Sequence, residues 1–183
     1  MMVDERRRAA RGWLTALLPN VSTKWPGDPG TLARLRRAPT SIAALTEAET
    51  LRLWKLLEGR QDQLSRIGTT ARVLAHVRNV APPARRRGAL ARTLGPGTFG
   101  AYETAKLKRL RFERLLATRE EEDLARAMIR LVQLAGREAP IDPGDLAVSI
   151  LDWDDERTRI DWALAYHDPD RMPVESAIAA EAA

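Results

Sequence analysis

Apolar residues recur at intervals of three and four positions through most of this chain, which is the period of one face of an α-helix. The clearest stripe is Leu124, Met128, Leu131 and Ala135, and arginine and glutamine lie opposite it. No stretch alternates apolar and polar residues for long enough to indicate a strand, and we find neither an internal repeat nor a sustained heptad. The sequence therefore predicts an all-α fold of about eight helices.

Local signals predict where several helices begin. An aspartate N-cap followed by a first-turn proline is expected twice, at Asp28-Pro29 and at Asp142-Pro143. Capping boxes are expected at Thr46 with Glu49 and at Thr118 with Glu121. Long helices are expected over residues 63–80 and 102–117. The second has leucines on two sides, so we expect it to be packed on both, with its cations emerging along the seams: Lys106, Lys108, Arg109, Arg111 and Arg114.

Two prolines and then four glycines, from Gly88 to Gly100, interrupt any long helix in the middle of the chain. We therefore expect two small helical subdomains packed together, residues 1–95 and 96–167. Residues 168–183 offer little to bury, so we expect a flexible tail there.

Composition limits the class of protein. The 183 residues are 44% hydrophobic, enough for a core, and they include no cysteine, so disulfides and thiol chemistry are excluded. No apolar run approaches the roughly 20 residues that cross a bilayer, and the first residues lack the apolar core of a signal peptide. We expect a soluble, cytoplasmic protein with no membrane contact.

Charge is distributed unevenly along the chain. Residues 1–117 hold 23 Lys and Arg against 9 Asp and Glu, a net charge of +14, whereas residues 118–183 hold 7 against 16, a net charge of −9. Arginine codon bias would explain arginine over lysine but not the scarcity of acidic residues in the first part. We interpret the asymmetry as an electropositive surface for phosphate, with the acidic part kept apart from it or offered to a basic neighbour.

Basic residues gather at three further places. The arginines at positions 6–8 and 11 are interpreted as a solvated, frayed terminus rather than a nucleic-acid arm. A short helix carries Arg34 and Arg37 on one side and Arg36 on another, and these either contact phosphate or are merely solvated. A loop carries the triplet Arg85, Arg86 and Arg87, and an exposed triplet is either merely solvated or a grip for nucleic acid. With the cations of residues 102–117, these form the candidate binding surface.

No motif for catalysis is present. The sequence lacks a P-loop, an HExxH zinc helix, a GxSxG nucleophile elbow and a dinucleotide-binding GxGxxG. His76 and His167 are the two imidazoles, and no second histidine or carboxylate stands at a metal-ligand spacing from His76. We therefore expect no enzymatic activity, no catalytic residue, no metal site and no cofactor.

Five segments in order resemble the small-subunit family, CasB, of the type I-E CRISPR Cascade complex. They are "GDPGTLARLRRA", "TLG" at 93–95, "KRLRFERLLA", "RLVQLAGREAPID" and "DLAVSILDWDDERTRIDWALAYH". Each alone is a Leu/Arg-rich helix, but the ordered set spans most of residues 13–167.

The resemblance implies a two-part all-α fold without enzymatic activity. It also implies partners: crRNA and target DNA, the other Cascade subunits, and a second copy of the chain within the ribonucleoprotein. In this antiviral assembly the family helps hold the crRNA-bound target and steadies the displaced strand. The nucleic-acid-binding positions that carry over are Arg36, Arg37, Arg109, Arg111 and Arg130; Arg85, Arg86, Arg87, Lys106 and Lys108 are added from charge alone.

Two alternative functions remain open from the sequence. A helical DNA-binding regulator would read bases in the major groove with a recognition helix. A protein-only helical scaffold would use its basic and acidic faces for other proteins.

Overall fold

The structure is a computed structural model of the chain, and it describes residues 2–20, 22–137 and 139–168. These parts contain ten α-helices and two short 3-10 helices, with isolated bridges at Asn20–Trp25 and Val80–Ile141 but no strand. The predicted all-α fold is confirmed. The elements are α1 (Val3–Leu17), α2 (Pro29–Arg37), α3 (Ser41–Ala44), α4 (Ala48–Leu56), η1 (Gln61–Gln63), α5 (Leu64–Leu74), α6 (Ala89–Leu94), η2 (Tyr102–Thr104), α7 (Arg109–Ala117), α8 (Glu121–Ala135), α9 (Pro143–Leu151) and α10 (Glu156–His167).

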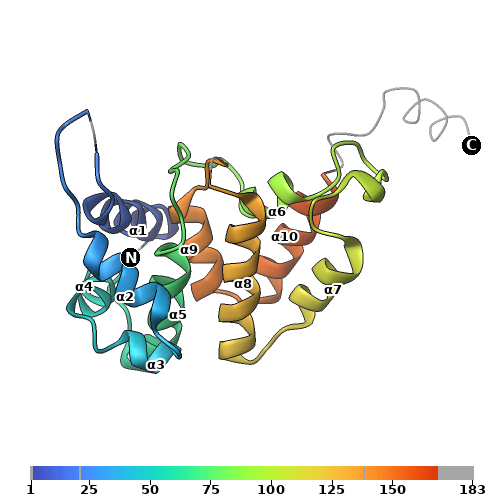
Figure 1. Cartoon of the computed structure of the whole chain (residues 1–183). Coiled ribbons are helices and arrows are strands. Elements are labelled where there is room, and N and C mark those ends of the chain that lie inside the picture. The colour runs from blue at the N-terminus through green and yellow to red at the C-terminus, as the bar shows by residue number, and fades with distance from the viewer. Residues whose placement is uncertain (1, 21, 138, 169–183) are drawn as a thin grey trace, which may run out of the picture.

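Helix α5 is the centre of the arrangement, and every residue from Ile67 to Leu74 on it is buried. It packs against α3, α4, α8 and α9, while α1 packs against α9 and α6 packs against α10 (Figure 1). Gly68 allows α3 to approach, because a Cβ at this position would lie 2.1 Å from the backbone oxygen of Ser41.

Helices from both sides of residue 95 contribute to one cluster of buried apolar residues. The division into two subdomains at that position stays a prediction. The predicted tail covers residues 168–183, of which 169–183 lie outside the described residues. No helix in the described ranges has both the length and the apolar character that a bilayer crossing requires.

Aromatic contacts hold α7 and α10 in place. The Phe112 ring stacks on the Tyr166 ring at a centroid distance of 4.0 Å, and the Tyr166 hydroxyl donates to the carbonyl of Leu107 at 2.7 Å. Trp162, also on α10, packs edge to face against Trp153, which lies between α9 and α10, with ring centroids 5.2 Å apart. Helix α7 therefore presents its cations from a fixed position.

The two aspartate–proline helix starts are confirmed. Asp28 accepts from the Thr31 N–H at 2.8 Å, Asp142 accepts from the Gly144 N–H at 2.9 Å, and a proline follows each. Both capping boxes are wrong, because α4 and α8 begin one and two residues later, after Glu47 and Glu120. The two threonine hydroxyls instead donate backwards to carbonyls of the preceding helical turn: Thr46 to Ala43 and Thr118 to Arg114.

Both long helices are shorter than predicted. The helix expected over residues 63–80 ends at Leu74, and the chain then extends so that Val80 pairs with Ile141. The helix expected over residues 102–117 begins at Arg109. Residues 105–108 are not helical and bend at 106–107, with Ala105 and Leu107 buried and the two lysines exposed. The Leu107 N–H donates to the Leu94 carbonyl at 2.9 Å.

Packing of α7 on two sides is also wrong. Phe112 and Leu115 are buried, but Leu110 is 58% exposed. One face of α7 therefore packs on the core, and the other faces solvent.

Candidate nucleic-acid interface

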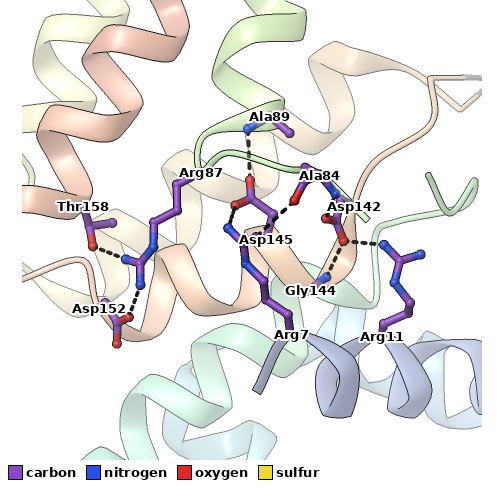
Figure 2. A network of polar contacts seen from close by, with 10 residues as sticks. All are labelled: Arg7, Arg11, Ala84, Arg87, Ala89, Asp142, Gly144, Asp145, Asp152 and Thr158. Carbon is purple, nitrogen blue, oxygen red and sulfur yellow. Dashed lines mark hydrogen bonds and ion pairs between the residues drawn. The ribbon is translucent and has the colours of Figure 1, made fainter. Parts of the chain in front are cut away.

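Much of the positive charge of the N-terminal part is neutralised inside the molecule. Arginines of α1 and of the loop before α6 point at aspartates of α9 and its C-terminal end (Figure 2). The pairs are Arg6 with Asp152 at 3.0 Å, Arg7 with Asp145 at 2.8 Å, Arg11 with Asp142 at 2.6 Å and Arg87 with Asp152 at 2.9 Å. We call this set the α1–α9 ion-pair network. The interpretation of the N-terminal arginines as a solvated, frayed terminus is wrong for Arg6, Arg7 and Arg11.

Asp145 lies deepest in this network, with a side chain that is 2% exposed. Burial raises the pKa of its carboxyl, while hydrogen bonding to the Ala89 N–H and the charge of Arg7 act in the opposite direction. The Ala89 N–H donates to it at 2.9 Å. The carboxylate therefore joins α1, α6 and α9 at one point.

A second group of ion pairs joins α5 to the start of α8. Arg66 contacts Glu121 at 2.8 Å, and the buried Arg72 contacts Glu122 at 2.7 Å. Burial alone would raise the pKa of Glu122, but hydrogen bonds from Ser41 and Arg72 outweigh it and hold that pKa below its usual value. The acidic start of α8 is thus tied to the chain's own arginines.

A groove between α7 and α8 carries cations that are not neutralised in this way. It has a volume of about 550 Å³, and we call it the α7/α8 groove. Arg111, Arg114 and Arg130 line it and are exposed, and none has a carboxylate partner in the part of the chain that the structure describes. Its other lining residues are mostly apolar: Leu107, Leu115, Thr118, Ala127, Leu131 and Leu134.

This geometry suits an extended anion with apolar surface of its own. The three guanidinium groups come from two helices, so an anion between them would be contacted from both sides. The leucines below supply an apolar floor but few hydrogen-bonding groups for reading a base edge. Of the predicted residues, Arg111 and Arg130 meet in this groove.

The other cations near α7 lie in different settings. Lys106 is exposed, and the Lys108 ammonium donates to the Glu103 carbonyl at 2.7 Å. Arg109 pairs with Glu113 at 2.8 Å and lies 5.4 Å from the ring centre of Tyr102. The hydrogen bond to Glu113 raises the pKa of Arg109. None of these three lines the α7/α8 groove.

Arg36 and Arg37 lie at the end of α2 and differ in exposure. Arg37 is exposed, whereas Arg36 is half-buried and donates from Nε to the Ala75 carbonyl at 2.6 Å. Burial and the charge of Arg78 lower the pKa of Arg36. Burial is also the main cause that lowers the pKa of His76 to about 4, and Arg36 and Arg78 lower it further. This corner of the molecule is strongly electropositive.

The three arginines of the triplet lie in two different environments. Arg87 points inward, donating to the Thr158 hydroxyl at 2.6 Å as well as pairing with Asp152. Arg85 and Arg86 are exposed and, together with Arg92, line a hollow of about 310 Å³. This hollow is separate from the α7/α8 groove.

Two more residues belong to candidate sites: Arg114, expected from the sequence only as one of the exposed cations of residues 102–117, and Trp25, for which the sequence predicted no role. Arg114 lines the α7/α8 groove, and its spacing of three from Arg111 on a helix was a signal for it. Trp25 is 52% exposed on the loop between α1 and α2. Its position between a lysine and Pro26-Gly27, away from any apolar stripe, was the signal there.

The fold and the groove define a class: an all-α protein with a basic groove and, in the described ranges, no side-chain cluster placed to hold a metal ion. Within that class, residues 31–167 match the family model described as CRISPR-associated protein Cse2, and the chain belongs to that family. It is thus a small subunit of a CRISPR Cascade complex, and this family is a non-catalytic component that acts with other subunits. No curated protein and no solved structure was found to match the chain.

Proposed function

We propose that this Cascade small subunit holds the sugar-phosphate backbone of single-stranded nucleic acid in the α7/α8 groove. One observation carries the proposal: Arg111, Arg114 and Arg130 converge on one groove without a carboxylate partner in the described chain. Neighbouring cations without counter-ions repel one another, and a bound polyanion relieves that repulsion. The apolar floor accommodates the sugars of the backbone without selecting a sequence.

The strand in the groove is the DNA strand that is displaced when crRNA pairs with its target. In RNA-guided recognition, base pairing reads the sequence, and the protein needs only to hold backbones and the displaced strand. Arg36, Arg37 and Arg85 extend the contact to crRNA and the paired target strand. A second copy of the chain and the other Cascade subunits complete this surface, and the subunit itself cuts nothing.

The ion pairs argue against a scaffold that only binds proteins. Such a scaffold would offer its acidic residues to a basic partner, but Asp142, Asp145 and Asp152 already pair with the chain's own arginines. The arginines of the α7/α8 groove have no carboxylate partner among the described residues, and they favour a phosphate ligand. A DNA-binding regulator would prefer one duplex sequence over random duplex, which a competition experiment measures.

The test is the salt dependence of single-strand binding by the full chain. Replacing Arg111, Arg114 and Arg130 by alanine removes three phosphate contacts, so the slope of log K against log salt should fall by about 2, at roughly 0.7 per contact on a single strand. Affinity should fall for every sequence alike. Fluorescence anisotropy over a salt series gives both quantities.

A matched control removes the same charge elsewhere. Arg52, Arg60 and Arg157 are exposed and lie on α4, at the start of η1 and on α10, away from the groove. Their triple alanine variant should keep a slope close to that of the wild type. If both triple variants lose affinity equally, net charge rather than the groove binds the strand, and the proposal fails.

A further inference from the structure

Trp25 is unusual among the five tryptophans of this chain. Trp13, Trp153 and Trp162 are 2%, 0% and 0% exposed, whereas Trp25 is 52% exposed. An indole left in water gives up the favourable free energy of burying its large apolar surface. A ligand that covers the exposed ring would recover it.

The exposed ring is held in place rather than free to turn. The Trp25 indole N–H donates to the carbonyl of Ala16 on α1 at 2.9 Å. The backbone of Trp25 exchanges two hydrogen bonds with Asn20, at 2.8 and 3.0 Å. Its loop closes back on the helix, since the Asp28 N–H donates to the Leu17 carbonyl at 2.9 Å. A fixed ring loses little conformational entropy when a ligand covers it.

The ring lines a hollow of about 530 Å³ between α1 and this loop, which projects from the helical body in Figure 1. Apart from the indole, the described residues that line the hollow include no large apolar side chain. They are Arg8, Arg11, Gly12, Thr15, Ala16, Asn20 and Thr23. Protein-binding hot spots cluster aromatic residues with other apolar groups, and that surrounding is missing among these residues.

The polar lining instead matches the parts of a nucleotide. Arg8 is exposed, and within the described residues its side chain makes one long hydrogen bond of 3.4 Å, to the Asp4 carbonyl, so its guanidinium remains suited to a phosphate. Arg11 is already engaged by Asp142. Asn20 and Thr23 supply an amide and a hydroxyl at the edge of the hollow. A flat aromatic face beside a cation is the arrangement on which unpaired bases stack.

We infer that the hollow at Trp25 is a stacking site for one unpaired base of a single-stranded nucleic acid, with Arg8 contacting the adjoining phosphate. The inference rests on the proposed function in that both take a single strand. It assigns a different site and a different chemistry, because stacking depends on the base and the α7/α8 groove on the backbone. The hollow also precedes residue 31, where the match to the family model begins.

The experiment compares a thymidine oligonucleotide with an abasic strand of equal length, using the full chain. The wild type should bind the base-containing strand on the order of 10-fold to 100-fold more tightly, the range that one stacked base contributes. Trp25→Ala should abolish that preference and leave the salt slope unchanged. Trp25→Phe keeps an aromatic face and should retain most of the preference, which shows that loss in the alanine variant is not loss of fold.

Photocrosslinking gives a second measurement that needs no variant. A strand carrying 5-iodouracil should crosslink to Trp25, as mapped by mass spectrometry. A preference for bases that survives Trp25→Ala, or crosslinks only at other residues, overturns the inference. If Trp25→Ala binds strands normally but no longer assembles with the other Cascade subunits, the site contacts protein and the inference is wrong. If instead the proposed strand binding in the α7/α8 groove is wrong, the alanine variant of Arg111, Arg114 and Arg130 would show an unchanged salt slope.

Discussion

The α1–α9 ion-pair network makes a quantitative prediction about stability. Replacing Arg7 by methionine keeps much of its apolar stem but leaves the Asp145 carboxylate, 2% exposed, without its cation. Removing one partner of a buried ion pair costs about 3–5 kcal/mol. The variant also leaves the Ala84 carbonyl without the Arg7 hydrogen bond at 3.1 Å, which adds about 1 kcal/mol. We therefore expect Arg7→Met to lower the free energy of unfolding by about 4–6 kcal/mol at pH 8.

The double variant Arg7→Met/Asp145→Asn should recover part of this loss. In the wild type the Ala89 N–H donates to the Asp145 carboxylate at 2.9 Å. An asparagine oxygen can still accept this hydrogen bond, and the double variant leaves no buried charge. The double variant should thus be more stable than Arg7→Met alone by about 2 kcal/mol. Unfolding in urea, followed by far-ultraviolet circular dichroism, gives the free energies, and Asp145→Asn completes the cycle.

The pH dependence of the single variant tests the same reasoning. Burial already raises the pKa of Asp145, so its folded form binds a proton more readily than its unfolded form and stability falls as pH rises through that range. Without Arg7 the pKa of Asp145 rises further. The loss of stability in Arg7→Met, relative to the wild type, should therefore shrink as pH falls from about 8 to about 5. A double variant that is less stable than Arg7→Met, or a loss that does not change with pH, would refute the reasoning.

Two further predictions concern α5 and the residues after it. The pKa of His76 is lowered to about 4, so the unfolded chain binds a proton that the folded chain does not between that value and about 6.5. Stability should fall by about 3 kcal/mol as pH drops through this window, and His76→Gln, measured by urea unfolding, should lack that part of the fall. Gly68→Ala would place a Cβ 2.1 Å from a backbone oxygen and should cost about 3 kcal/mol, whereas Gly12→Ala, with nothing within 4 Å, should be neutral or stabilising; the thermal midpoints decide.

The sequence predicted the fold class because helical periodicity is a local property. It predicts too long a helix at 102–117 because the spacing of Ala105 and Leu107 from Phe112 and Leu110 fits a helix, whereas their alternation with two lysines also fits a non-helical segment. Tertiary contacts decide between the two: the Leu94 carbonyl takes the Leu107 N–H.

The candidate site was predictable only in part, for a related reason. A count of charges predicts a basic half but not which arginines are neutralised, since Arg7 and Asp145 are 138 positions apart. Arg87 and Arg111 look equivalent in the sequence, but one points at Asp152 and the other lines the α7/α8 groove. Arg130 meets Arg111 because α7 and α8 are consecutive helices joined by a short turn, a pairing that local spacing does suggest.

The α1–α9 ion-pair network also sets an order of events during synthesis. Helix α1 leaves the ribosome before α9, and the carboxylate that Arg6 requires, Asp152, follows 146 residues after Arg6. At roughly 5–20 residues per second, the first helix waits on the order of ten seconds with its arginines unpaired. During that time α1 is a short basic helix close to ribosomal RNA. Its arginines are paired only once the residues of α9 and its ends have been synthesised and packed against it. Residues from the last third of the sequence thus neutralise Arg6, Arg7 and Arg11, and of the arginines of α1 they leave Arg8 exposed.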